Sequence, residues 1–187
     1  MDLLNRNELE QLFARADAND ASPAHNVSVP MPLLDLYIIW KEKGTLDGLR
    51  VALLGNLKSN ERAQTLARLL GRFDVRLSFV SPAALSMPYD ISEELRAANL
   101  EVEETNDLPT TLAKSDVLYL VRLDPKLIEP KIFARYKDFY TLTPTTTAVA
   151  KPGLLVLGEW EGAELLLEHA RAHATQYEGA LKAALPD

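Results

Sequence analysis

The apolar residues of this 187-residue chain fall into short unbroken runs that alternate with segments of helical spacing. Runs of this length and composition are typical of buried strands, and they cover 50–54, 75–80, 100–103, 117–121 and 154–157. Between the runs, apolar positions recur every three or four residues, as they do in amphipathic helices. We expect those helices over 60–70, 91–98 and 108–113 and within 125–136.

Strands that alternate with helices favour the α/β fold class. Parallel strands need long crossover connections, so the pattern predicts a parallel sheet with helices on both faces. The run 100–103 alternates polar and apolar residues, which marks it as an edge strand. We therefore predict a Rossmann-like three-layer domain with a five-stranded parallel sheet.

Extra helices are expected at both ends of this domain. A helix over 32–43 has proline in its first turn and glycine after its last residue. Apolar stripes also mark helices over 8–16 and 161–185, and each stripe must pack either on this domain or on a partner chain. We divide the chain into an N-terminal helix and loop, 1–30, and an α/β domain, 31–187.

Composition narrows the classes of protein. The chain has no cysteine, which excludes disulfides and thiolate chemistry and fits a cytoplasmic protein. A net charge of −7 argues against a nucleic-acid binder, which needs a basic face. No apolar run approaches the length of a membrane span, and the first residues do not read as a signal peptide. We expect no nucleic-acid partner and no membrane association.

Candidate ligand-binding residues follow two of the predicted strands. In open α/β sheets, ligands bind outside the carboxyl ends of the strands. Asn56 and Lys58 follow the first strand, Arg62 lies at the start of the next helix, and Arg122 follows the fourth strand. One interpretation is a site for an anion or an amino acid. The other is structural, with a solvated turn at Asn56 and Lys58 and with Arg122 paired to an acid such as Asp124.

The remaining chemistry-bearing residues give weaker signals. No glycine-rich dinucleotide fingerprint follows the first strand. His169 and His173 are four residues apart, but a solvated helix face explains them more simply than a metal site. We expect no cofactor, no metal and no catalytic residue.

Three segments in a fixed order carry a resemblance to a known family. They are Leu-Leu-Asp-Leu-Tyr at 33–37, Gly-Asn-Leu-Lys at 55–58 and Asp-Val-Leu-Tyr-Leu-Val-Arg at 116–122. From about residue 32 to 162, the chain resembles the second, aspartate-binding domain of aspartate carbamoyltransferases. The resemblance implies the same α/β fold. It also implies that the family's first domain, with its phosphate-binding loop, is missing from this chain.

The chain departs from the family's pattern where the resemblance places substrate contacts. Ser28–Met31 stands in place of His-Pro-Thr-Gln, and Glu61 takes a substrate-binding arginine position, with Arg62 one residue late. Asp124 replaces a glutamine, and Gly158–Gly162 replaces His-Pro-Leu-Pro-Arg. These departures imply that catalysis has been lost.

The resemblance therefore predicts a non-catalytic, aspartate carbamoyltransferase-like protein. Its expected role is that of a structural or regulatory partner of pyrimidine-biosynthesis enzymes, with aspartate carbamoyltransferase or dihydroorotase as the partner. Trp160 either plugs the former cleft or anchors that partner. The alternatives are a small anion- or amino-acid-binding protein, or a carbamoyltransferase subunit active only with a partner chain. A homo-oligomer is compatible with all three.

Overall fold

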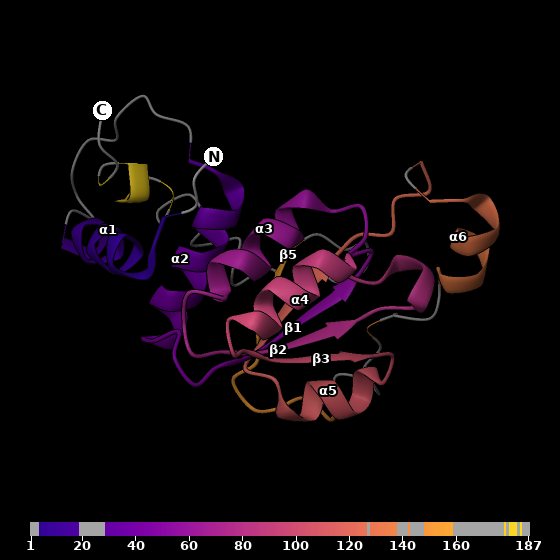
Figure 1. Cartoon of the computed structure of the whole chain (residues 1–187). Helices are drawn as coiled ribbons and strands as arrows, with labels where there is room; N and C mark the ends of the chain where they lie inside the picture. The colour runs from indigo at the N-terminus through magenta and orange to yellow at the C-terminus, as the bar shows by residue number, and fades with distance from the viewer. Residues whose placement is uncertain are drawn as a thin grey trace.

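Five parallel strands form one sheet in the order β3-β2-β1-β4-β5 (Figure 1). The computed structural model describes residues 4–18, 29–126, 128–137, 142, 148–158, 178, 180–182 and 184. The strands are β1 (Arg50–Gly55), β2 (Arg76–Val80), β3 (Glu101–Thr105), β4 (Val117–Val121) and β5 (Leu155–Gly158). The predicted α/β class, the parallel sheet and the position of each strand are confirmed.

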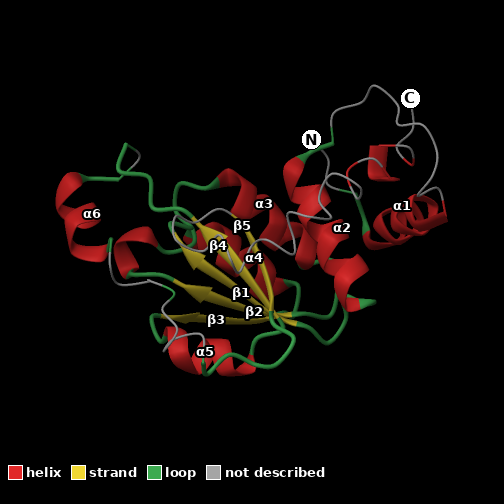
Figure 2. Cartoon of the chain, turned by 180° about the vertical axis from the view of Figure 1, so that it is seen from behind, coloured by secondary structure: helices red, strands yellow, loops and turns green. Residues whose placement is uncertain are grey.

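Some of the helices cover the two faces of the sheet, and others lie beyond it (Figure 2). They are α1 (Arg6–Ala18), α2 (Met31–Lys43), α3 (Glu61–Leu70), α4 (Tyr89–Ala97), α5 (Leu108–Lys114) and α6 (Pro130–Tyr136), with a short 3-10 helix, η1 (Ala83–Leu85). The core side chains of α2, α3 and α4 pack on one face of the sheet, and those of α5 pack on the other. This is the three-layer arrangement that the sequence predicts.

The central strand β1 is apolar on both sides. Val51 and Leu53 belong to the larger core, which α2, α3 and α4 complete, whereas Ala52 and Leu54 belong to the smaller core beneath α5. All four side chains are almost fully buried. Burial on both faces explains why this strand reads as an unbroken apolar run rather than as an alternating one.

The N-terminal helix α1 packs on this domain. The ring of Phe13 lies 5.3 Å from that of Tyr37 and 5.6 Å from that of Trp40, both on α2. The sequence left open whether the apolar face of α1 meets this domain or a partner, and the contacts settle that question for α1. The predicted helix over 161–185 lies mostly outside the described residues, although Ala180, Leu181 and Ala184 belong to the same core.

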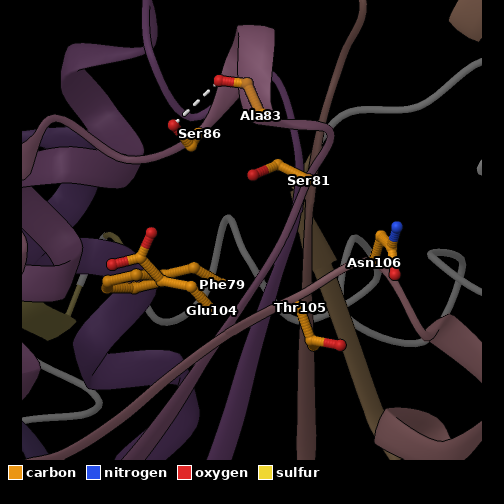
Figure 3. A pocket seen from close by; sticks show the side chains of 7 residues that line it. All are labelled: Phe79, Ser81, Ala83, Ser86, Glu104, Thr105 and Asn106. Carbon is orange, nitrogen blue, oxygen red and sulfur yellow. Dashed lines mark hydrogen bonds between the residues drawn. The ribbon is translucent and has the colours of Figure 1, made fainter.

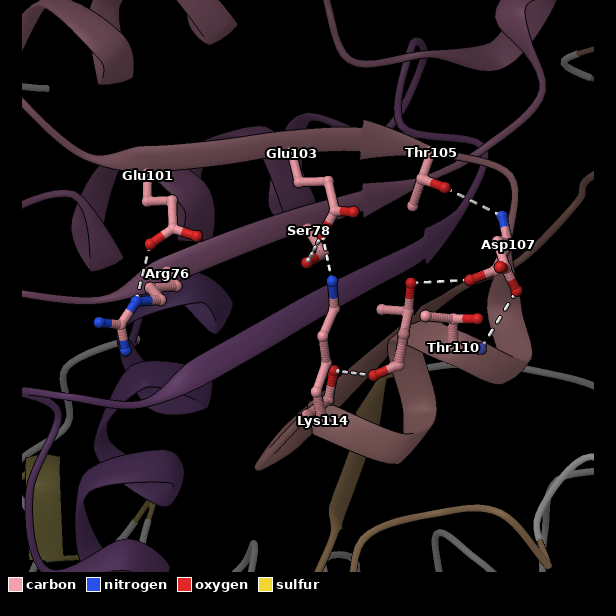
Figure 4. Close-up of polar contacts among 10 residues, drawn as sticks. Arg76, Ser78, Glu101, Glu103, Thr105, Asp107, Thr110 and Lys114 are labelled. Atoms are coloured by element: carbon pink, nitrogen blue, oxygen red, sulfur yellow. Dashed lines mark hydrogen bonds and ion pairs between the residues drawn. The ribbon is translucent and has the colours of Figure 1, made fainter.

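The edge strand β3 carries a row of polar contacts with its neighbours (Figure 4). Arg76 on β2 donates to Glu101 at 2.7 Å, and Lys114 on α5 donates to Glu103 at 2.6 Å. Ser78, also on β2, bonds Glu103 at 3.3 Å. Charged side chains along an edge oppose pairing with a further strand. The expected edge position of this strand is confirmed.

Most helix boundaries differ from the expected ones by one or two residues, and the differences at α4 and α6 have a clear local cause or consequence. The helix α4 ends at Ala97, so Ala98, which the prediction includes in the helix, is its exposed C-cap. The helix expected somewhere within 125–136 occupies only its second half, as α6. Pro130 opens α6, and a proline disfavours helical geometry in the residue before it.

Candidate functional site

The loops after β1 and β4 leave the sheet side by side. Gly55, the last residue of β1, pairs in register with Val121, the last residue of β4. Asn56, Lys58 and Arg122 therefore lie at the same side of the sheet, just beyond the carboxyl ends of β1 and β4. The two strands are neighbours in the middle of the sheet, although β2 and β3 separate them along the chain. This edge is where an open α/β sheet binds ligands.

The loop after β1 is held by hydrogen bonds. The side-chain oxygen of the buried Asn56 accepts from the amide of Ser59 at 3.3 Å. The amides of Leu57 and Lys58 both donate to the carbonyl of Leu85 in η1, at 3.0 and 3.2 Å. Asn56 therefore shapes this turn with its side chain, but it is buried, whereas the structural interpretation of the sequence expected a solvated turn.

The side chain of Lys58 is exposed at the surface of this loop. Its backbone carbonyl accepts from the amide of Gln64 at 3.0 Å, and the same amide group donates to the Leu57 carbonyl. No hydrogen bond or ion pair joins the Lys58 ammonium group to another described residue. Lys58 is therefore held by its backbone while its charge faces solvent.

Arg62 is bound to a buried carboxylate. Its Nε and Nη2 atoms donate to the two oxygens of Asp35 at 2.7 and 2.6 Å. Tyr119 donates its hydroxyl to the same carboxylate at 2.9 Å, and Asp35 is only 3% exposed. A bidentate, charge-assisted pair of this kind is among the stronger hydrogen-bonded contacts. It joins α2, α3 and β4 just below the candidate site.

Sequence reasoning missed Asp35 and Tyr119 as partners of Arg62. One signal was present: Asp35 is a single acid within the otherwise apolar run 33–39. A charge in such a run is almost always paired. Its position did not indicate which cation pairs with it.

The loop after β4 carries charges of both signs. Arg122 is exposed, and the Asp124 carboxylate accepts from the backbone amide of Lys126 at 2.8 Å. Glu61, at the start of α3, is also exposed. The positive charges of Lys58 and Arg122 would attract an anionic ligand. The nearby carboxylates of Glu61 and Asp124 would repel it.

A second polar cluster lies at the amino ends of β1 and β4, on the side of the sheet opposite to the candidate site. Asp116 accepts hydrogen bonds from the backbone amide of Arg50 at 2.9 Å and from the Lys151 ammonium group. Burial acts to raise the pKa of Asp116, but these hydrogen bonds outweigh it and hold the pKa below its ordinary value. Burial lowers the pKa of Lys43, which donates to the Gly153 carbonyl. The position of this cluster, away from the ligand-binding edge, indicates a structural role.

Some sequence predictions fall on residues that the structure does not describe. Trp160 and the paired histidines lie there, so the prediction of a partner anchor stays a prediction. Within the described ranges, no three His, Cys, Asp or Glu side chains gather closely enough to hold a metal ion. No helix in those ranges is long and apolar enough to cross a membrane.

Comparison with known sequences places the chain beside one group of enzymes. No protein-family model matches it. The aspartate carbamoyltransferase catalytic subunit of Methanopyrus kandleri is 40% identical over 128 residues, which are 68% of this chain and 40% of that protein. The corresponding subunit of Thermococcus onnurineus is 37% identical over 142 residues, or 75% of this chain and 45% of that protein. The multifunctional protein pyr1-3 of Dictyostelium discoideum is 32% identical over 126 residues, or 67% of this chain and 6% of that protein.

Solved structures of the same group share the fold. Aspartate transcarbamoylase from Trypanosoma cruzi, in complex with carbamoyl aspartate and phosphate, aligns with a TM-score of 0.70 at 27% identity. That alignment covers 82% of this chain and 52% of that one. The catalytic subunit of M. jannaschii aspartate transcarbamoylase aligns with a TM-score of 0.70 at 26% identity, over 81% of this chain and 52% of that one.

The chain spans less than half of the length of the catalytic subunits that it matches in sequence, 40% and 45% for the two above. The matches nevertheless agree in sequence and in three-dimensional fold, and they cover most of the described domain. The chain therefore belongs to the aspartate carbamoyltransferase family.

Proposed function

We propose that this chain is a non-catalytic member of the family that acts as a structural or regulatory partner of pyrimidine-biosynthesis enzymes. The observation that carries the proposal is the placement of Arg62. It forms a bidentate pair with Asp35, while Glu61 takes the position that the family resemblance gives to a substrate-binding arginine. The start of α3 thus presents a carboxylate where the resemblance requires a cation.

The chemistry of carbamoyl transfer explains why this substitution matters. Both substrates are anions, and the developing charge needs positioned cations or hydrogen-bond donors. Removal of one such donor lowers a rate by roughly 100- to 1000-fold. Reversal of the charge adds repulsion, and Asp124 contributes a second carboxylate near the same edge. We infer that this site alone does not support useful transfer.

A role beside other enzymes has separate support. The relative named multifunctional protein pyr1-3 contains the homologous segment as only 6% of its length. A domain of this kind therefore exists as a small part of a much larger protein. We propose aspartate carbamoyltransferase or dihydroorotase as the partner of this chain, with Trp160 as a candidate anchor residue.

An activity assay tests the first half of the proposal. The chain is assayed for carbamoyl-aspartate formation alone, and then after mixing with each candidate enzyme. We expect no product from the chain alone. Arg122→Ala, at the end of β4, is the matched variant. Product from the chain alone that falls with Arg122→Ala would overturn the proposal. Product found only in the mixture, and lowered by Arg122→Ala, would identify a subunit that is active with a partner chain.

Affinity purification from the source cells tests the second half. We expect a carbamoyltransferase or a dihydroorotase to copurify with the chain, and we expect Trp160→Ala to weaken that association. Lys126→Ala, an exposed change after β4, serves as the control. Recovery of a strict monomer without a pyrimidine-pathway enzyme contradicts a partner role.

A second candidate function is the binding of a small anion or amino acid. The observation that favours it is the exposed Lys58 ammonium group on a loop that η1 and Gln64 hold in place. Titration calorimetry with phosphate, carbamoyl phosphate and aspartate tests this function. Binding that Lys58→Ala weakens and Lys126→Ala leaves unchanged would support it. The absence of heat with all three compounds would exclude it.

A further inference from the structure

The helix α6 projects from the body of the domain (Figure 1). None of its residues is buried, and its partly buried Ile132 and Phe133 pack on a small cluster of Leu85, Leu123 and Ile128. This cluster is separate from the two main cores of the sheet. The outer face of α6 is therefore uncovered within the described part of the chain.

The outer face of α6 and the loop before it are basic. Five cations but only two carboxylates fall within 122–137, in a chain whose net charge is −7. Lys126, Lys131 and Arg135 are exposed, and no ion pair joins any of these three to a carboxylate of another described residue. Lys131 and Arg135 are four positions apart on the helix, where like charges repel each other. We call these three cations the basic face.

A patch of the opposite charge lies at the start of α4. Tyr89 opens this helix and is 76% exposed, more than any other large apolar residue in the described ranges. The neighbouring Asp90 is exposed and has no cation paired with it among those residues. Glu93 and Glu104 share a single cation, Arg96, at 3.0 and 2.8 Å. Tyr89, Asp90, Glu93 and Glu104 therefore form an acidic patch with an exposed aromatic ring.

A hollow of about 380 Å³ lies beside Glu104, between η1 and the end of β3 (Figure 3). Of the described residues that line it, only Glu104 carries a charge. The hollow makes this side of the acidic patch concave, whereas α6 projects. Docking surfaces need complementary shapes as well as complementary charges.

The basic face and the acidic patch lie on the same side of the molecule. Leu85, the last residue of η1, belongs to the cluster beneath α6, and α4 begins only four positions later. No ion pair links the two surfaces within the described part of one chain, and Arg135 lies instead over the ring of Tyr136, at 5.3 Å. When two complementary surfaces share one side of a molecule, a two-fold axis can place each on its counterpart in a second copy.

From this arrangement we propose that two copies of the chain form a symmetric dimer, in which α6 of each copy docks on the start of α4 of the other. Lys131 and Arg135 pair with Asp90 and Glu93, and the ring of Tyr89 packs against the same cations. A second copy fits better than an unrelated acidic protein, because one chain carries both surfaces and each contact then forms twice. The proposal is independent of the proposed function, which concerns other enzymes.

Sedimentation velocity of the full chain tests the proposal over a series from about 1 to 200 µM, the range of weak protein association. We expect monomers at the low end and a reversible equilibrium with dimers at the high end. If the chain stays monomeric throughout, or if its oligomer is larger than a dimer, the proposal is wrong.

Charge reversal locates the contact. Lys131→Glu combined with Arg135→Glu should weaken dimerisation by at least about tenfold, because like charges then meet across the interface. Asp90→Lys combined with Glu93→Lys should do the same. An equimolar mixture of the two double variants should form dimers again, since each reversed surface meets a reversed counterpart and each native surface a native one. A mixture that remains monomeric, or variants that dimerise as the parent does, would overturn the assignment.

The control is Arg15→Glu combined with Arg72→Glu, two exposed positions outside both surfaces. It changes the net charge as much as the α6 variant does, and it should dimerise as the parent does. An equal loss in the control would attribute the effect to net charge and contradict the docking surface. Tyr89→Ser, which alters no charge, should weaken dimerisation by about tenfold and decides the question if a double variant fails to fold.

Discussion

The carboxylate of Asp35 holds three elements together. It accepts two hydrogen bonds from Arg62 on α3 and one from Tyr119 on β4, and it comes itself from α2. A buried charge of this kind stabilises the fold only while its partners remain, because an unpaired carboxylate in the core is strongly unfavourable. The side chain of Arg62 is also 25% exposed, so its own charge loses only part of its hydration.

Replacement of Arg62 should therefore destabilise the chain more than its place on the surface of α3 indicates. We expect Arg62→Met to lower the free energy of unfolding by about 3 kcal/mol, since it leaves the Asp35 charge with Tyr119 alone. The matched control is Arg68→Met on the same helix, which removes a pair with the half-exposed Glu94 and should cost less than about 1 kcal/mol. Urea unfolding measures both. Equal losses would show that the buried Asp35–Arg62 pair contributes no more to stability than the exposed Arg68–Glu94 pair.

Asp116 should make the free energy of unfolding fall as the solution becomes acidic. Its pKa in the folded chain lies below the ordinary value, so its contribution is fully present above the unfolded pKa of about 3.9 and is lost as the pH falls below that value. Asp116→Asn should lower the free energy of unfolding by about 1–2 kcal/mol at pH 7. It should also flatten the decline in stability between about pH 5 and pH 3. A variant that retains the steep acid decline of the parent would contradict the assignment.

At the residue scale, the sequence predicts locations better than partners. Asn56, Lys58 and Arg122 lie at the strand ends where the pattern placed them. Arg62 lies beside them, but its partner is 27 positions away in the chain, and the Tyr119 hydroxyl reaches the same carboxylate across 84 positions. Such pairs depend on the packing of α2 against α3 and β4, and strand and helix periodicity carries no information about that packing.

At the element scale, the last residue of β5 lies so close to the backbone of β4 that it has no room for a side chain. Gly158 has a φ of +98°, and a Cβ atom there would overlap the Leu120 carbonyl oxygen and come within 2.8 Å of the Leu120 amide nitrogen. Both obstacles are backbone atoms of β4, which cannot move aside without disturbing the sheet. Glycine is therefore required where this strand ends.

Gly158→Ala should consequently be among the most damaging single changes in the chain. We expect a loss of at least about 3 kcal/mol, because backbone strain and a direct overlap act together. Gly153→Ala is the matched control: its φ is also positive, at +78°, but no atom lies within 4 Å of the added methyl group. It should cost about 1–2 kcal/mol. Thermal unfolding measures the loss of stability in each variant. Similar losses would mean that the backbone of β4 moves aside for the added methyl group at little cost.

The helix α1 should be an integral part of this domain. Leu9, Leu12, Phe13 and Ala16 are fully or almost fully buried. Phe13→Ala should cost about 3–5 kcal/mol in unfolding free energy. Gln11→Ala, on the exposed face of the same helix, should change stability by no more than about 0.5 kcal/mol. If Phe13→Ala is as stable as Gln11→Ala, the packing of α1 on α2 is not maintained in solution.

The strands were the elements most open to sequence prediction. The apolar runs of β1 and β4 match the observed strands closely, because burial on both faces leaves no polar positions in these strands. The exposed edge strand β3 was placed one or two residues too early. Helix ends were less certain. The start of α6 at Pro130 and the exposure of Ala98 depend on local backbone geometry that the spacing of apolar residues does not encode.

At the scale of the whole molecule, the family relationship and the charge pattern point in different directions. The fold and most of the sequence match aspartate carbamoyltransferase catalytic subunits. The candidate site, however, presents Glu61 and Asp124 beside Lys58 and Arg122. A scaffold can persist while the groups at its strand ends change, because the core and the site depend on different residues. That separation is how the chain could keep the fold of the family while losing the catalysis, as we propose.

The order of the strands also has a consequence for the kinetics of folding. The chain forms β1, β2 and β3 in succession, so each of these neighbours pairs across one short crossover. The pairing of β1 with β4 is much more distant in sequence. Asp116, just before β4, accepts a hydrogen bond from the Arg50 amide of β1 across 66 positions. Long loops are slow to close, and parallel sheets with distant pairings fold late. The half of the sheet from β1 to β3 should therefore form first, and the central seam between β1 and β4, where the candidate site lies, should close in the last slow step.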